Sequence, residues 1–315
     1  MKRLNFFVSL TTADNDFQLE QAKATEEAAR RLGVDIQIKF AENDSITQSQ
    51  QLLDVIQSRS ASHPDAIVFE PVGATGLPQV ARAAAAAGIG WVVLNRDVDY
   101  ITDLRKAFRV PIFSITSDHE EIGRIQGRQL GALLPNGGSV LYVEGPPEHP
   151  AAKQRSAGMY ETKPVQVRMK TMRAQWTEAS AHKAVSSWLR LSTSQQMHID
   201  VIAAHDDSMA VGAKKAFQEM PEGPSRDHWL SLPFLGIDGM PKTGQAWVRS
   251  GLLAATIVVP PNAGQALVML TQAVQKNTLP PERTFTVPVS YPPINQLGAT
   301  QAVKTKVLSA SNSQK

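Results

Sequence analysis

One stretch of the chain, residues 201–213, carries polar side chains in a pattern that could bind a ligand. Its first four residues are apolar, which is typical of a short buried strand in a parallel sheet. Asp206 and Asp207 follow this strand and precede a helical pattern, where side-chain oxygens often cap the first turn. Ligands of open α/β sheets bind beyond the carboxyl ends of the strands. The pair is therefore either part of a ligand site or a pair of helix caps.

Polar residues recur at the same position after other expected strands. They are Asp14 with Asn15, Glu70, Asn95 with Arg96, and Asp238. This repetition favours a binding site over isolated caps, because a sheet gathers the carboxyl ends of its strands at one edge. If two sheets point these edges at one another, the polar residues meet across a single cleft.

The elements that must position these residues alternate along the chain. Strands are expected at 6–10, 34–40, 65–69, 91–94, 112–116, 139–143, 165–172, 201–204, 252–259 and 284–289. Helices are expected at 17–32, 46–56, 77–87, 120–134, 151–159, 179–191, 242–249 and 262–275. Alternation of this kind specifies parallel sheets with right-handed crossovers. Two runs of about five strands predict an α/β protein of two doubly wound lobes.

Composition narrows the possible functions. The 315 residues are 42% hydrophobic and 19% charged, which is ordinary for a globular protein, and the formal net charge of +3 gives no argument for a nucleic-acid partner. The absence of cysteine excludes disulfides, thiolate metal sites and a cysteine nucleophile. The seven histidines form no close metal-ligand pair, so no metal site is expected. No cofactor is expected either.

The hydrophobic stretches of the sequence are too short for a membrane span or for a visible leader. No window approaches 18 uninterrupted apolar residues. Residues 4–10 are too short and too polar for the core of a signal peptide, and we expect them to form the first strand. Either a leader was removed from this chain, or the protein is not exported.

Six motifs follow one another along the chain: Asn95-Arg96, 116–118 (TSD), 151–158 (AAKQRSAG), 204–207 with 209–212 (AHDD and MAVG), 236–239 (GIDG) and 251–256 (GLLAAT). With these motifs, nearly the whole chain, about residues 4–298, resembles the type I periplasmic sugar-binding proteins. Ribose- and galactose-binding proteins typify this family, and the effector domains of LacI-type repressors share its fold. Each motif is weak alone, but six in the family's order are specific.

The resemblance implies two lobes joined by a three-crossing hinge that closes on a sugar. The expected N-terminal lobe is 1–117 plus 260–289, and the expected C-terminal lobe is 118–259 plus 290–315. By position the family's ligand contacts fall on Asn15, Phe17, Glu70, Asn95, Arg96, Arg155, Trp176, Asp206 and Asp238. Carboxylates and arginine suit sugar hydroxyls, and aromatic faces suit the C–H patches of a sugar ring.

Each of these residues also has a purely structural interpretation. Phe17 and Trp176 could pack in a core, and Arg155 could belong to a structural ion pair. His205 is expected either behind the ligand-contacting residues or in a turn, rather than on the ligand. Asn95 stands where pentose and hexose binders usually carry Asp, and residues 97–111 form a longer connection than usual. The identity of the sugar therefore stays open, with a furanose, a modified sugar, a polyol or another small polar molecule as alternatives.

The resemblance implies a non-catalytic, extracytoplasmic solute-binding protein that delivers a sugar or polyol to an ABC-type permease. The alternative is a sensor that presents the bound sugar to a membrane receptor or regulator. A monomer is expected. Hydrolase, P-loop, zinc-protease and full dinucleotide-binding motifs are absent, and no helix-turn-helix fits ahead of the first strand.

Overall fold

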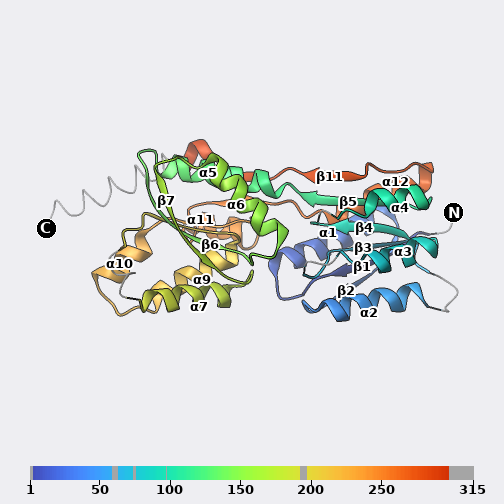
Figure 1. The fold of residues 1–315 in the computed structure, drawn as a ribbon, viewed down its shortest axis with the longest axis horizontal. Coiled ribbons are helices and arrows are strands. Elements are labelled where there is room, and N and C mark those ends of the chain that lie inside the picture. Colours follow the sequence, from blue (N-terminus) through green and yellow to red (C-terminus); the bar gives the residue numbers. More distant parts are fainter. Residues whose placement is uncertain (1–2, 59–62, 74–75, 97, 192–196, 298–315) are drawn as a thin grey trace. The chain divides into compact units, whose positions relative to one another are not determined.

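A computed structural model describes residues 3–58, 63–73, 76–96, 98–191 and 197–297 (Figure 1). The chain divides into two compact units, residues 1–117 with 260–287 and residues 118–259 with 288–315. It therefore passes from one unit to the other three times. The third passage follows Val287 rather than residue 289.

Unit 1 is built on a six-stranded sheet whose pairings are all parallel. The strand order is β11-β5-β4-β3-β1-β2. The strands are β1 (Asn5–Leu10), β2 (Asp35–Phe40), β3 (Ala66–Phe69), β4 (Gly90–Leu94), β5 (Ile112–Ser117) and β11 (Arg283–Thr286). Because β2 and β3 lie on opposite sides of β1, the connections reverse direction between β1 and β3. This reversal is the switch point at which open α/β sheets bind ligands.

Two layers of helices bury the sheet of unit 1 on both faces. One layer contains α1 (Asp16–Leu32) and α12 (Ala263–Lys276), and the other contains α2 (Ser45–Ile56), α3 (Pro78–Ala86) and α4 (Ile101–Ala107). All residues of β3 and β4 are buried, which explains why these strands are apolar throughout instead of alternating.

The helix α4 was not expected from the sequence, which indicated a long connection over 97–111. Its Ile101 and Leu104 enter the core beneath the sheet. Arg105 fixes the segment further, because its guanidinium donates to the carbonyl oxygens of Ile112 at 2.6 Å and Pro280 at 2.9 Å. The segment is therefore part of the unit 1 scaffold. With only seven residues, the helix gave too short a periodic pattern to identify.

Unit 2 contains a four-stranded parallel sheet with the order β7-β6-β8-β9. The strands are β6 (Gly138–Glu144), β7 (Val167–Arg173), β8 (Val201–Ala204) and β9 (Phe234–Leu235). The helices are α5 (His119–Leu133), α6 (Pro150–Thr162), α7 (Glu178–Leu189), α9 (Asp207–Gln218), α10 (Pro224–Ser231) and α11 (Gly244–Arg249). By the same reasoning as in unit 1, the switch point of this sheet lies between β6 and β8.

Two expected strands differ from those observed. The strand predicted at 252–259 is reduced to β10 (Thr256–Val258), and the strand predicted at 284–289 is divided into β11 and β12 (Val289–Tyr291). β12 pairs with β10 in antiparallel fashion, whereas β11 joins the parallel sheet of unit 1. Pro288 lies at the division, and proline cannot donate a ladder hydrogen bond.

Glycines bring α5 and α6 unusually close together. A Cβ atom on Gly158 would lie 2.0 Å from the carbonyl oxygen of Glu120, and one on Gly123 would lie 2.0 Å from the carbonyl oxygen of Arg155. Both distances are far below van der Waals contact, so the missing side chains set the separation of the helices. The backbone of Arg155 is thereby seated directly against α5.

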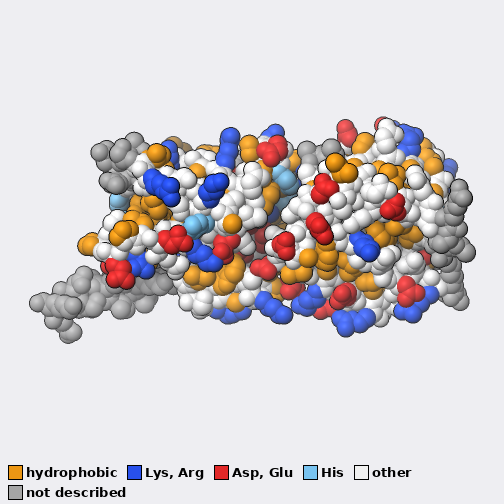
Figure 2. Space-filling model, turned by 90° about the horizontal axis from the view of Figure 1, so that it is seen from below, with side chains coloured by type: hydrophobic (Ala, Val, Ile, Leu, Met, Phe, Trp, Pro, Cys, Tyr) orange, Lys and Arg blue, Asp and Glu red, His pale blue; other side chains and the backbone are white. Residues whose placement is uncertain are grey.

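The face of the molecule drawn in Figure 2 carries charges of both signs. Figure 2 shows acidic and basic side chains intermingled on the face that it draws, without one large basic patch. None of the helices in the described residues has the length and apolar character needed to cross a membrane.

We expect Gly158→Ala to destabilise the protein by about 1–3 kcal/mol, because the added methyl group must push α5 and α6 apart. Urea unfolding followed by tryptophan fluorescence measures this change. Gly131→Ala in α5 is the matched control. Its Cβ would lie 3.4 Å from Pro164 Cγ, so helix propensity should make it neutral or stabilising by up to about 1 kcal/mol. Equal effects of the two substitutions would contradict the close helix contact.

Candidate ligand-binding site

In unit 1 the predicted residues lie just beyond β1, β3 and β4. Asn15 is the N-cap of α1, and its side chain accepts a hydrogen bond from the backbone amide of Gln18 at 3.2 Å. Phe17 is half-buried in the first turn of the same helix. Glu70 directly follows β3, so Asn15 and Glu70 flank the switch point between β1 and β3.

Asn95 is the centre of a buried amide network in unit 1. Its Nδ2 donates to Glu70 Oε2 at 3.1 Å, and its Oδ1 accepts from Asn262 Nδ2 at 2.6 Å. Asn262 Oδ1 in turn accepts from Gln21 Nε2 at 2.8 Å. An Asp at position 95 could accept from Asn262 but could not donate to Glu70. The amide therefore suits this site, at a position where pentose and hexose binders usually carry Asp.

Glu70 and Arg96 are charged groups placed in a largely buried environment. Burial raises the pKa of Glu70, while the amides of Gln18 and Asn95 and the charge of Arg96 act in the opposite direction. Burial likewise lowers the pKa of Arg96, and Glu70 opposes this shift. Arg96 Nη2 also donates to the carbonyl oxygen of Pro71 at 3.3 Å. The two side chains thus compensate part of the desolvation of one another.

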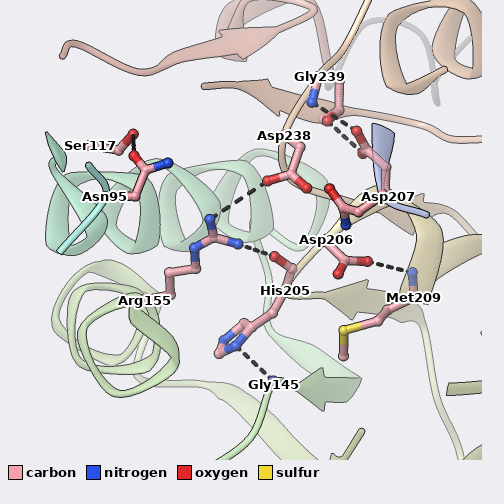
Figure 3. Close-up of polar contacts among 12 residues, drawn as sticks. Asn95, Ser117, Gly145, Arg155, His205, Asp206, Asp207, Met209, Asp238 and Gly239 are labelled. Atoms are coloured by element: carbon pink, nitrogen blue, oxygen red, sulfur yellow. Dashed lines mark hydrogen bonds and ion pairs between the residues drawn. The ribbon is translucent and has the colours of Figure 1, made fainter. Parts of the chain in front are cut away.

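In unit 2, Arg155 brings the predicted residues together (Figure 3). It projects from α6 and is only 6% exposed. One terminal nitrogen donates to the carbonyl oxygen of His205, and the other lies 3.6 Å from Asp238 Oδ1. The guanidinium carbon lies 5.4 Å from the ring centroid of Trp176, within the range of a cation–π contact. Arg155 therefore joins a carboxylate and an aromatic face at the ends of the strands.

Asp206 and Asp207 at the start of α9 have different roles. Asp206 is the N-cap, and its side chain accepts from the amide of Met209 at 2.5 Å. Asp207 accepts from Thr256 Oγ1 at 2.6 Å and from the amide of Gly239 at 2.8 Å. Asp207 thus fixes the turn that contains Asp238.

Burial governs the protonation of both carboxyl groups. It raises the pKa of Asp206 to about 6, although the Met209 amide and the Arg155 charge favour the ionised form. It raises the pKa of Asp207 well above the ordinary value, and the nearby charge of Asp238 adds to this shift. Of the three carboxyl groups, Asp206 and Asp238 are the two that the Arg155 charge reaches. Among the described residues, no group of three or more acidic or histidine side chains could hold a metal ion.

Three of the predicted site residues adopt a backbone conformation that is unfavourable for a residue with a side chain. Asn95, Trp176 and Asp238 have φ angles of 51°, 44° and 103°. Left-handed conformations are uncommon outside glycine and asparagine, and they cost about 1–2 kcal/mol. Strain of this kind is often concentrated at functional sites. It supports assigning Trp176 and Asp238 to a site, since a turn selected only for stability would favour glycine.

The structure therefore connects Glu70, Asn95 and Arg96 in unit 1, and Arg155, Trp176 and Asp238 in unit 2. Asn15 and Phe17 stand at the start of α1, whose Gln18 hydrogen-bonds to Glu70. The sequence interpretation omitted Asn262. It also did not predict that the buried carboxylate of Asp207 accepts hydrogen bonds from Thr256 and from the amide of Gly239. Asn262 follows two prolines and begins α12, so it is easily taken for an ordinary helix cap. Its side chain makes no capping bond and serves the amide network instead.

We expect Asp206→Asn to stabilise the protein by about 1–3 kcal/mol at pH 7 and to have little effect near pH 4. The folded-state pKa of about 6 exceeds the ordinary 3.8, so the native state binds more protons between these values. The contribution of the Asp206 carboxyl group to the free energy of unfolding therefore falls as the pH rises from about 4 to 6. The asparagine side chain carries no charge at any of these pH values, so the substitution removes this loss. Thermal unfolding at both pH values measures the difference.

Asp118→Asn is the matched control, because Asp118 also caps a helix, accepting from the Glu121 amide at 2.9 Å, but is only half-buried. It should change stability little at either pH. A destabilised Asp206→Asn protein at pH 7 would show that the carboxylate is favourable in the folded state.

Comparison with known proteins places this geometry in a family. Residues 6–278 match the family model described as a periplasmic binding protein domain. A Rhizobium meliloti protein named as a rhizopine-binding protein is 28% identical over 219 residues, which cover 67% of this chain and 66% of the relative. The ribose import binding protein of Bacillus subtilis is 24% identical over 262 residues, covering 82% of this chain and 77% of the relative.

A solved structure has the same fold. It is a periplasmic solute-binding protein of an ABC transporter from Actinobacillus succinogenes with bound D-allose, and it superposes with a TM-score of 0.79 at 20% sequence identity. The superposition covers 94% of this chain and 99% of that protein. Since the family model spans most of the sequence, the chain belongs to the periplasmic binding protein family.

Proposed function

We propose that the protein captures a sugar or sugar-like polyol and delivers it to an ABC-type importer. The observation that carries this proposal is the environment of Arg155, whose buried guanidinium lies beside the carboxylate of Asp238 and the face of Trp176. A sugar offers hydroxyl groups that donate and accept, together with apolar C–H faces. Charged groups bind the hydroxyls strongly, and an aromatic ring covers the C–H surface.

Each unit contributes part of this proposed binding function. Unit 2 supplies Arg155, Trp176, Asp206 and Asp238, and unit 1 supplies Asn15, Phe17, Glu70, Asn95 and Arg96. By family resemblance, a ligand that gains the contacts of both units favours a closed arrangement over an open one. The hydrogen bonds within each unit support preorganisation, because groups already held in place lose less entropy on binding.

Several further points support delivery over catalysis or sensing. The family consists of solute-binding proteins, which supports an extracytoplasmic, non-enzymatic role. One relative is named as an import binding protein, which supports delivery to a permease over presentation to a receptor. We further propose that the protein acts as a monomer. The titratable side chains of the proposed site can all form hydrogen bonds to a ligand, and this binding role requires no proton transfer.

A thermal-shift screen tests the proposed function. D-ribose, D-allose, D-galactose and myo-inositol are added separately to the purified protein, and at least one should raise the melting temperature. A ligand at 100 times its Kd stabilises the native state by about 2.7 kcal/mol. Chromatography of the recovered ligand should show it unchanged. Turnover in proportion to protein concentration would contradict the binding role.

Trp176→Ala should weaken binding of the sugar found in that screen by about 1–3 kcal/mol, because it removes the aromatic face. Isothermal titration calorimetry measures the loss. Tyr160→Ala is the matched control, since Tyr160 is an aromatic residue of α6 that is 47% exposed. It should leave affinity unchanged. Unaltered affinity in Trp176→Ala would assign Trp176 to packing alone.

A further inference from the structure

We propose that His205 is a positioning residue for Trp176. Its ring stacks against the indole of Trp176 and also anchors the loop at Gly145, against which Trp176 packs. The proposal rests on the proposed function in one respect, since it assigns Trp176 to a ligand site. His205 is fully buried directly after β8, at the switch point of the unit 2 sheet. From this position it contacts Gly145, which follows β6, and Trp176, which lies after β7.

The first contact anchors the loop after β6. The backbone amide of Gly145 donates to His205 Nδ1 at 3.0 Å. Burial and the charge of Arg155 lower the pKa of His205 well below its usual value, so the ring is neutral. Because Nδ1 accepts, the proton resides on Nε2, which lies 2.6 Å from the hydroxyl oxygen of Tyr142. Both ring nitrogens therefore have defined partners.

The second contact supports the indole ring. The rings of His205 and Trp176 stack with centroids 6.0 Å apart and planes inclined by 22°. Gly145 lies against the same indole, since a Cβ atom added there would be 2.5 Å from Trp176 Cη2. The histidine thus fixes the tryptophan directly by stacking and indirectly by holding Gly145 in place.

A third contact connects the same residue to the other central side chain of unit 2. The carbonyl oxygen of His205 accepts from Arg155. Arg155 and Trp176 therefore both depend on the placement of residue 205, although only Trp176 depends on its ring. An apolar residue would fill the volume equally well but would leave the Gly145 amide without an acceptor, at a cost typical of a buried unpaired donor.

Two substitutions separate the functions of the ring. His205→Phe keeps a ring for stacking but removes the acceptor for Gly145, whereas His205→Asn keeps a short acceptor but removes the ring. The chain contains five tryptophans, so labelling with 5-fluorotryptophan gives five fluorine resonances. Trp176→Phe identifies the resonance of Trp176. No ligand is needed for this experiment.

Both substitutions should shift the Trp176 resonance and increase its solvent isotope shift, while the resonances of Trp188 and Trp229 stay in place. These two tryptophans pack together in the core of unit 2 and report on the fold. His182→Ala is the control, because His182 is a more exposed histidine that pairs with Glu219. It should leave all five resonances unchanged.

The proposal is overturned if the Trp176 resonance of both variants matches that of the wild-type protein. It is also overturned if the Trp176, Trp188 and Trp229 resonances move together, since His205 would then be a general core residue. If one variant does not fold, the other still gives this comparison, and Gly145→Ala tests the loop contact independently. A sugar screen without a hit would overturn the proposed function but not the positioning of Trp176.

Discussion

The energetic constraint on which unit 2 depends is the burial of the Arg155 guanidinium. A charge removed from water costs several kcal/mol unless neighbouring groups compensate for it. The compensation comes from the carbonyl oxygen of His205, the carboxylate of Asp238 and the face of Trp176. Arg155 Nε has no partner among the described residues, so the compensation is incomplete. Stability alone would be better served by an apolar side chain, and this supports our proposal that the arrangement serves ligand binding.

The scaffold around Arg155 explains how such a group can be held in one place. Gly123 allows α5 to contact the backbone of Arg155, and Asp207 fixes the turn that carries Asp238. A Cβ atom added at Gly236 or Gly244 would lie only 2.1 or 2.0 Å from a carboxylate oxygen of Asp207, far inside van der Waals contact. The glycines therefore leave space for a carboxyl group that the fold encloses. In unit 1 the buried polar groups are held in place by amides, since Asn262 donates a hydrogen bond to Asn95.

Much of the fold could be predicted from the sequence because parallel strands buried on both faces are apolar throughout. β8 (Val201–Ala204) has the predicted bounds, and the observed α1 begins one residue before the predicted helix. The failures have local causes. The helix α4 is too short for a clear periodicity, and Pro288 divides a stretch that has strand-like composition.

The candidate site was predicted less completely than the fold. The positions of Arg155 and Asp238 followed from family motifs, but their contact through space could not be deduced from residues so far apart in the sequence. Asn262 and Asp207 resembled helix caps, because capping and networks of buried hydrogen bonds use the same residue types. The left-handed backbone at Trp176 has no signal in the sequence, since tryptophan does not favour it.

Our central proposal is that one sugar molecule binds per chain and that polar residues of each unit contribute to its affinity. Titration calorimetry with the sugar that stabilises the protein most tests it directly, using one variant in each unit, Arg155→Lys and Glu70→Gln. The account predicts one ligand per chain, with each variant weakening that single binding event about tenfold or more, equivalent to about 1.4 kcal/mol. Two ligands per chain, or a loss confined to the variant of one unit, would contradict it.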